Sequence, residues 1–472
     1  MKQKKSHAVL RYATLLVVML SLLNAAFGIL VLPGKPSDPG QNTYAHHNFL
    51  MSVIHPSYAV EGTATPGMLL PCESATAQYR CYTPEQIQTA YDADPLYQHG
   101  IDGAGRSIVI IDAFQSPTLR HDLHKFDQIF GLPDPQLNIY APEGLAPFNQ
   151  KDPTQVSWAA EITLDVEWAH AIAPGATINL VLANPQVDTS QTFSGFLLNM
   201  LQATRFAVEN NLGDVISQSF GGNEACASPY ALSVQHSVFE EAAEQNITLI
   251  AASGDDGTAI DNCASTGLQQ GVSTPASDPL VTAVGGTTLA ASASGEYIDE
   301  SGWTDSGGGF STVYARPEYQ SNAVAAGAGR GLPDVSYDAN PASGMLVIWS
   351  SSGRGANKAV AFGGTSAGAP QWAGITALLD QSIQARFGAL NPALYSIDRS
   401  NQFTQVFHDV VSGSNTYIGK GAHGVAIDVP GYTAGYGWDA VTGLGTPDIS
   451  HLAEFLPQRF GAWMNPFYYA SK

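Results

Sequence analysis

Short, continuous apolar runs recur along the central part of the chain, and longer amphipathic stretches separate them. The run Ser107–Ile111 is rich in β-branched residues, which is typical of a strand buried on both faces. Similar runs predict buried strands at Thr177–Leu182, Val215–Ser217 and Ile247–Ala252. A helical periodicity predicts helices between and after them, at Ser157–Ile172, Thr192–Asn210, Ala231–Glu244 and Gln371–Ser382.

Because strands and helices alternate, the chain is predicted to be α/β, with a parallel sheet covered by helices on both faces. In such sheets the functional residues gather beyond the carboxyl ends of the strands. Residues 29–80 are polar and rich in Pro and Gly, which indicates a short pro-segment or linker. A helix is expected from Thr83, with Pro84 at its first position. We therefore predict one large folded domain over 81–456 and an aromatic tail over 457–472.

The N-terminus has the features of a secretory signal peptide. Basic residues between Lys2 and Arg11 precede the apolar run Tyr12–Leu23, and small residues follow it. This run is short for a membrane span, although an uncleaved anchor is the alternative. We predict that residues 1–28 are removed, that the protein is secreted to the extracellular space, and that it then has no membrane association.

The chain has four cysteines, which fit an oxidising compartment. Of the three pairings that four cysteines allow, we expect Cys72–Cys81 with Cys226–Cys263. The cysteines do not form the closely spaced pairs of a zinc site.

The composition is acidic, with 20 Lys and Arg against 41 Asp and Glu and a formal net charge of −21. Such a surface repels phosphate backbones, so we expect no nucleic-acid partner. Few cations remain to repel one another once the carboxylates are protonated, which favours a protein that works in acid.

A candidate nucleophile is Ser366, which follows Gly363 and Gly364 and precedes a predicted helix. The start of a helix leaves free N–H groups, which can stabilise an oxyanion. The alternative is that Ser366 only caps the helix. A serine nucleophile normally needs a histidine base, yet none of the 12 histidines is followed by Gly-Thr as in a subtilisin-type protease.

Carboxylates offer a different base. Glu161 and Asp165 are four residues apart on a predicted helix, so they share one face and would tend to share a proton. Glu167 lies off that face, and we expect it at the surface. Asp255 directly follows a predicted strand, where a protonated carboxyl can donate to a developing oxyanion. Solvated acids on the helix and an ordinary turn at Asp255 are the alternatives.

Together these segments resemble the sedolisin family, the serine-carboxyl peptidases with a subtilisin-like fold. The resemblance covers about residues 82–456 and rests on the order of its motifs: Glu161 and Asp165, then Ser-Gly-Asp ending at Asp255, then Gly-Thr-Ser-Ala around Ser366. It implies that Ser366 attacks the scissile carbonyl and that Glu161 acts as general base and acid. Asp165 would then orient Glu161, and Asp255 would line the oxyanion hole.

The resemblance also implies two supporting features. Asp112 matches a position where some relatives carry a Glu that extends the carboxylate network. A C-terminal loop region is expected to bind one calcium ion through the carboxylates or carbonyls of Asp409, Val410, Gly435, Gly437 and Asp439.

The predicted function is therefore an acid-acting endopeptidase that cleaves polypeptide substrates through an acyl-enzyme, as a monomer. A tripeptidyl exopeptidase of the same family and a catalytically inactive, calcium-stabilised binding protein are the alternatives. Two departures from the family are notable: about fifty residues stand where relatives carry a long pro-domain, and Phe220 stands where some relatives have Trp.

Overall fold

The computed structural model describes the part of the chain that folds around one central sheet. The described residues are 58–63, 65, 70–73, 79–185, 192–264, 266–325, 328–352, 356–398, 400–420 and 426–463. The predicted signal peptide, most of the predicted linker and the end of the aromatic tail lie outside them. Within the described ranges, no helix has both the length and the hydropathy needed to cross a membrane.

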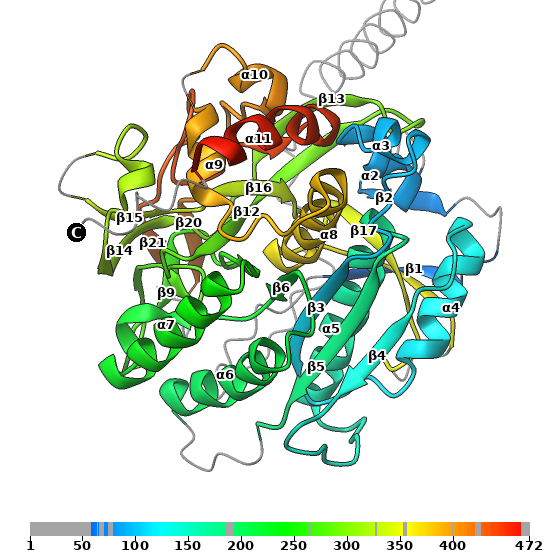
Figure 1. Ribbon diagram of the computed structural model, residues 1–472. Coiled ribbons are helices and arrows are strands. Elements are labelled where there is room, and N and C mark those ends of the chain that lie inside the picture. The colour runs from blue at the N-terminus through cyan, green and yellow to red at the C-terminus, as the bar shows by residue number, and fades with distance from the viewer. Residues whose placement is uncertain are drawn as a thin grey trace, which may run out of the picture. The chain divides into compact units, whose positions relative to one another are not determined.

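A sheet of eight strands forms the centre of the fold (Figure 1). Its strands lie in the order β13-β12-β8-β6-β3-β5-β4, and β16 also pairs with β12. Neighbouring strands run parallel, except that β13 is antiparallel to β12. The strands are β3 Ser107–Ala113, β4 Leu137–Tyr140, β5 Thr177–Ala183, β6 Val215–Gln218, β8 Thr248–Ala252, β12 Val281–Ala291, β13 Tyr297–Gly302 and β16 Val335–Asp338.

Helices cover both faces of this sheet, and β3 shows the reason. Ile108 and Ile110 belong to the hydrophobic cluster that contains α4, α5 and α8, whereas Val109 and Ile111 belong to the cluster that contains α6 and α7. All four side chains are 0% exposed, so the predicted buried strand is confirmed. The covering helices are α4 Leu119–Phe130, α5 Pro153–Ile172, α6 Phe193–Glu209, α7 Pro229–Glu244 and α8 Thr365–Ile383.

A second, four-stranded sheet has the order β1-β18-β17-β2. Its strands are β1 Tyr58–Thr63, β2 Arg80–Tyr82, β17 Ser343–Trp349 and β18 Lys358–Phe362. β1 comes from the predicted linker and lies antiparallel to β18, with Tyr58 opposite Phe362. β18 leads directly into the Gly-Gly-Thr-Ser segment that ends at Ser366. Part of the predicted linker is thus a strand of the folded domain.

Shorter elements complete the described chain. The helices are α2 Pro84–Ala90, α3 Asp94–Gln98, α9 Asn391–Ile397, α10 Phe403–Val406 and α11 Ile449–Trp463, with 3-10 turns η1 Pro71–Glu73, η2 Glu224–Cys226 and η3 Glu318–Gln320. The strand pairs are β7 Gly222–Asn223 with β11 Ser273–Thr274, β9 Ala259–Asp261 with β10 Leu268–Gln270, β14 Gly309–Ala315 with β15 Gly329–Leu332, β19 Phe407–His408 with β22 Thr446–Pro447, and β20 Tyr417–Lys420 with β21 Ala426–Val429.

Local predictions from the sequence are confirmed at several of these elements. Disulfides join Cys72 to Cys81 and Cys226 to Cys263, as expected. Thr83 caps α2 in a reciprocal capping box, with Pro at the start of the helix. At the other end of the chain, α11 runs across the expected boundary between residues 456 and 457.

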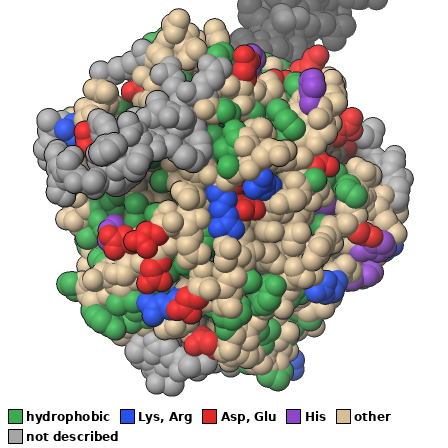
Figure 2. Space-filling model, viewed as in Figure 1, with side chains coloured by type: hydrophobic (Ala, Val, Ile, Leu, Met, Phe, Trp, Pro, Cys, Tyr) green, Lys and Arg blue, Asp and Glu red, His purple; other side chains and the backbone are tan. Residues whose placement is uncertain are grey.

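Charged side chains are sparse on the face of the molecule shown in Figure 2. Lys and Arg side chains there lie in small, separate groups among acidic, hydrophobic and other polar side chains. This distribution agrees with the excess of 41 acidic over 20 basic residues in the sequence.

Candidate active site

The helix α5 carries two of the predicted carboxylates through the interior of the protein. It begins after Asp152, whose side chain caps it, and Pro153 is its first residue. Every residue of Trp158–Ile172 is buried. Glu161 and Asp165, one turn apart, are both 0% exposed. The alternative of two solvated acids on an exposed helix is therefore excluded.

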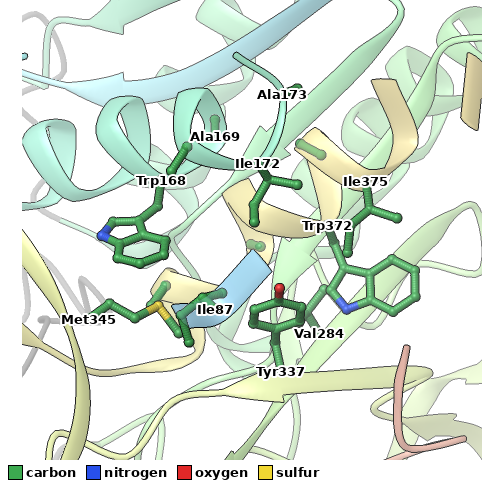
Figure 3. Packing of buried hydrophobic residues seen from close by; sticks show 14 of the residues in the cluster. Ile87, Trp168, Ala169, Ile172, Ala173, Val284, Tyr337, Met345, Trp372 and Ile375 are labelled. Atoms are coloured by element: carbon green, nitrogen blue, oxygen red, sulfur yellow. The ribbon is translucent and has the colours of Figure 1, made fainter. Parts of the chain in front are cut away.

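Close packing holds α5 against α8, the helix that carries Ser366. Figure 3 shows Ile172 of α5 in the same cluster as Trp372 and Ile375 of α8. Gly374 permits this approach, because a Cβ atom at that position would lie only 2.7 Å from the Cβ atom of Ile172. The two helices are thus fixed relative to each other by large, fully buried side chains on both sides of a glycine contact.

Asp112 joins Glu161 and Asp165 from the carboxyl end of β3. Burial, followed by the charges of Asp165 and Asp112, raises the pKa of Glu161 well above its ordinary value. Burial and the charge of Asp112 likewise raise the pKa of Asp165 well above its usual range. Burial raises the pKa of Asp112 to about 8. Three carboxyls this close in a buried site retain protons among them in acid.

Ser366 lies in the first turn of α8, close to these carboxyls. The helix begins at Thr365, six residues before the predicted start at Gln371, and Gly364 rather than Ser366 is its N-cap residue. Ser366 is 0% exposed. The prediction placed the start too late because Pro370 lies inside the helix, where proline usually ends one.

The structure shows how α8 accommodates this proline. Pro370 has no N–H group, so the carbonyl of Ser366, four residues earlier, has no helical donor from that position. The hydroxyl of Ser219 donates to this carbonyl at 3.4 Å. The Ser219 hydroxyl also lies near Asp165 and lowers the pKa of that carboxyl, against the larger effect of burial. Ser219, which was not predicted as a site residue, thus lies between the acidic helix and the nucleophile helix.

The hydroxyl of Ser366 faces the carboxyl of Glu161. Hydrogen bonding from this hydroxyl lowers the pKa of Glu161, against the larger effect of burial. Neither oxygen of Glu161 has a partner with complete hydrogen-bond geometry, so this contact is a loose one. Catalytic hydrogen bonds are often long before substrate binds, and the pair is arranged for proton transfer between serine and carboxylate.

Asp255 reaches the same site from the loop after β8. Its Oδ1 accepts hydrogen bonds from the amide and the hydroxyl of Thr365, both at 2.7 Å. Burial raises the pKa of Asp255 to about 7, although both bonds from Thr365 lower it. The residue as a whole is partly exposed, but its Oδ2 atom is buried. Asp255 thus stays protonated in acid, with Oδ2 near Gly364.

The structure therefore brings all the predicted chemical groups of the active site together. Asp112 comes from β3, Glu161 and Asp165 from α5, Asp255 from the loop after β8, and Ser366 from α8. Their mutual effects on the pKa of Glu161 place four of them around that carboxyl. The arrangement can take a proton from a serine hydroxyl and can donate a hydrogen bond to an oxyanion.

Glu167 corrects the prediction of a surface residue. It is 0% exposed, and its Oε2 accepts the amide N–H of Ile348 in β17 at 2.9 Å. The prediction was wrong because α5 is buried on every side, so a position off the catalytic face still faces protein. His170, on the same helix, is also buried, and its Nε2 lies 3.2 Å from Asp127.

The loop region predicted to bind calcium has its carboxylates engaged with backbone amides. Asp409 accepts the N–H of Gly437 through both oxygens, at 3.1 and 3.2 Å. Asp439 accepts the N–H of Gly435 at 3.0 Å and the N–H groups of Val441 and Thr442 at 2.8 and 2.9 Å. Burial and the neighbouring Asp398 raise the pKa of Asp409. These two acids therefore belong to one connected loop structure with the predicted glycines.

A cluster that the sequence did not indicate lies at the start of α11. Ligand atoms of Asp92, Asp448 and His451 lie within 4.8 Å of one another, the one such group found among the described residues. Asp448 Oδ1 accepts the backbone N–H of His451 at 3.1 Å and lies 2.8 Å from its ring Nδ1. These contacts are those of a helix cap, which explains the cluster without a metal.

Comparison with known proteins agrees with this geometry. The family model described as the subtilase family matches residues 154–393, which include α5 and the segment up to α9. A solved structure, Pseudomonas sedolisin, a serine-carboxyl proteinase complexed with pseudo-iodotyrostatin, superimposes with a TM-score of 0.68 at 29% identity and covers 81% of this chain and 100% of that chain.

Curated relatives include enzymes with different names. Kumamolisin of Bacillus sp. (strain MN-32) is 33% identical over 404 residues, 81% of this chain and 65% of its own length. Sedolisin of Pseudomonas sp. (strain 101) is 34% identical over 54% of this chain and 43% of its own length. Tripeptidyl-peptidase 1 of Mus musculus is 31% identical over 63% of this chain and 51% of its own length.

The chain belongs to the subtilase family and, within it, to the sedolisins. It has the subtilisin-like α/β fold of that group. The chain spans less than two thirds of the length of these curated relatives.

Proposed function

We propose that this protein is a secreted, acid-acting serine-carboxyl endopeptidase with Ser366 as its nucleophile. The observation that carries the proposal is the meeting of Ser366 with the buried carboxyls of Glu161, Asp165 and Asp112, and with Asp255 on a neighbouring loop. Relatives named as serine-carboxyl proteinase and as peptidases support it. The two disulfides fit an extracellular site of action.

In the proposed reaction, ionised Glu161 takes the proton of Ser366 as its Oγ attacks the scissile carbonyl carbon. The proton shared with Asp165 and Asp112 keeps the cluster from carrying several charges at once. The carbonyl oxygen becomes an oxyanion and accepts a hydrogen bond from protonated Asp255. Glu161 then gives its proton to the leaving amine, and water hydrolyses the acyl-enzyme by the same steps.

This mechanism predicts that activity is confined to acid. The pKa of Asp255 is raised to about 7, so its donor proton is present below that pH and lost above it. We expect kcat/KM to fall as the pH rises through about 7. A pH–rate profile with its maximum at neutral pH or above would contradict the proposal.

The decisive experiment is mass spectrometry of a peptide library incubated with the purified protein in acid. Cleavage by the wild type and its absence in Ser366→Ala are expected. Internal cuts without regard to distance from the N-terminus support an endopeptidase, whereas successive release of tripeptides supports the exopeptidase named among the relatives. A folded protein that leaves every peptide intact is instead the inactive binding protein. Full activity in Glu161→Gln would point to a histidine base.

We also propose one structural calcium ion at the C-terminal loop. The residues offer the oxygen ligands that calcium prefers. Asp409 and Asp439 supply carboxylates, and Val410, Gly435 and Gly437 have backbone carbonyls in the same loop structure. A cation would also relieve the repulsion between Asp409 and Asp398.

We expect EGTA to lower the thermal unfolding temperature and added calcium to restore it. The Asp409→Asn variant, which keeps the side-chain shape, should lose most of this response. An unfolding temperature that is indifferent to EGTA and calcium in the wild type rules the ion out.

A further inference from the structure

The contacts of Asp255 distinguish its two oxygens. Oδ1 accepts the N–H and the hydroxyl of Thr365, both at 2.7 Å. A carboxyl oxygen has two lone pairs, so these donors occupy both acceptor positions of Oδ1. Oδ2 is buried and has no hydrogen-bond partner among the described residues. A proton on Asp255 therefore belongs on Oδ2.

The hydroxyl proton of Thr365 also has a defined direction. The backbone N–H of Gly254 donates to Thr365 Oγ1 at 3.1 Å, so the hydroxyl acts as an acceptor on that side. Its single proton is left for Oδ1 of Asp255. The carbonyl of Gly254 in turn accepts the N–H of Gly307 at 2.8 Å, which holds the loop in place. The direction of the Thr365 hydroxyl is thus set by backbone groups that do not titrate.

Gly364 keeps the space beside Oδ2 open. A Cβ atom at Gly364 would lie 2.5 Å from Oδ2 of Asp255, and its φ of +113° is one that L side chains rarely adopt. Oδ2 therefore faces the turn that joins β18 to the helix of Ser366.

We propose that Thr365 is a positioning residue that keeps Oδ1 of Asp255 an acceptor, so that the proton lies on Oδ2 and is presented to the substrate's developing oxyanion. This inference rests on the proposed peptidase function. No proton is transferred in this contact: Oδ2–H donates a hydrogen bond to the former carbonyl oxygen while the Ser366 Oγ–carbon bond forms. Without the hydroxyl of Thr365, the proton would be divided between the two oxygens and the donor would be less often in place.

The kinetic test compares Thr365→Val with Thr365→Ser. Valine keeps the shape and the backbone N–H but removes the hydroxyl, and serine keeps the hydroxyl. We expect Thr365→Val to lower kcat about tenfold with little change in KM, because the oxyanion contact forms only in the transition state. Thr365→Ser should restore most of kcat. A Ser variant as slow as the Val variant, or a Val variant with wild-type kcat, overturns the inference.

A second measurement does not depend on turnover. In Ser366→Ala protein labelled with ¹³C in its Asp carboxyls, Asp255→Asn identifies the signal of Asp255, which is then titrated with and without Thr365→Val. The bond from the hydroxyl lowers the pKa of Asp255, so its loss should raise the midpoint by about half a unit or more. An unchanged midpoint overturns the inference.

If the proposed peptidase function is wrong, the cleavage assay gives a different result. Wild-type and Ser366→Ala proteins would then treat peptides alike at every pH, whatever the titration of Asp255. Without peptide hydrolysis there is no oxyanion for the Oδ2 proton to bind. That result therefore overturns both the proposed function and the positioning role of Thr365. Peptide cleavage that depends on Ser366 but is insensitive to Thr365→Val leaves the function intact and overturns the positioning role alone.

Discussion

At the scale of single residues, Gly364 connects the backbone of the nucleophile turn to the proposed oxyanion site. Its φ is +113°, and a Cβ atom there would meet Oδ2 of Asp255 at 2.5 Å. The amide N–H that follows it, on Thr365, is bonded to the other oxygen of the same carboxyl. One residue therefore needs both the conformational freedom and the small size of glycine.

We predict that Gly364→Ala lowers kcat/KM by about a hundredfold, because displacement of Asp255 removes an oxyanion donor. The strained backbone should also cost about 1–3 kcal/mol in the free energy of unfolding. Steady-state kinetics and urea unfolding measure the two effects. Gly131→Ala is the matched control: its φ is also positive, at +73°, but its Cβ atom would have nothing within 4 Å, so near-wild-type activity is expected. A Gly364→Ala variant that is as active as this control would refute the prediction.

At the scale of elements, β1 shows how the chain before the catalytic domain contributes to the site. β1 pairs along β18, and β18 runs directly into the turn before Ser366. On its other side β18 pairs with β17. Loss of β1 would turn β18 from an internal strand into an edge strand, with a row of unpaired backbone groups.

We predict that deletion of residues 58–63 lowers the thermal unfolding temperature and reduces kcat, since the strand that positions the nucleophile turn loses its partner. Deletion of residues 52–57, which has the same length, is the control and should have a smaller effect on both. Thermal melts and cleavage of a peptide substrate measure these changes. Equal effects of the two deletions would show that the β1–β18 pairing does not support the site.

Element pairing also explains the position of Glu167. β2 pairs with β17 only at Ser343–Met345, and further along the chain carboxyls of α5 and α4 accept backbone amides of β17 and of the residue that follows it. Glu167 Oε2 accepts the N–H of Ile348 at 2.9 Å, and Asp122 Oδ2 accepts that of Ser350 at 3.0 Å. These carboxylates accept the backbone N–H groups that the carbonyls of a neighbouring strand would otherwise accept.

At the scale of the whole molecule, many carboxyls are buried with a raised pKa. Burial raises the pKa of Asp112 and of Asp380 to about 8, that of Asp255 to about 7, and that of Glu167 well above its ordinary value. Folding therefore favours the protonated form of these groups. Their contribution to stability is complete below the pKa of the unfolded chain and is lost as the pH rises through the folded pKa.

We predict that the unfolding temperature falls between about pH 4 and about pH 8, the interval between the usual carboxyl pKa and the raised values of Asp112 and Asp380. Glu167→Gln removes one titrating group and should flatten this dependence. The exposed Glu241→Gln is the control and should leave it unchanged. Calorimetry across this interval measures the effect, and a protein that gains stability with rising pH would contradict it.

The sequence was enough to predict four strands of the central sheet (β3, β5, β6 and β8), four of the five helices that cover it, the disulfide candidates and the residue types of the site. Local signals carry these: β-branched runs for strands, the Thr83–Pro84 start of α2, and two acids one helical turn apart. The ordered motifs then distinguished Glu161, Asp165, Asp255 and Ser366 from the many other acids and serines.

The groups that surround each of these residues depend on how distant parts of the chain fold together. The tertiary structure buried Glu167, started α8 at Thr365 despite Pro370, and placed β1 beside β18. These outcomes depend on partners far away in the sequence, such as Ser219 for the helix that contains proline. The physical reason is the same in each case: burial leaves a polar group dependent on whichever distant segment supplies its hydrogen bond.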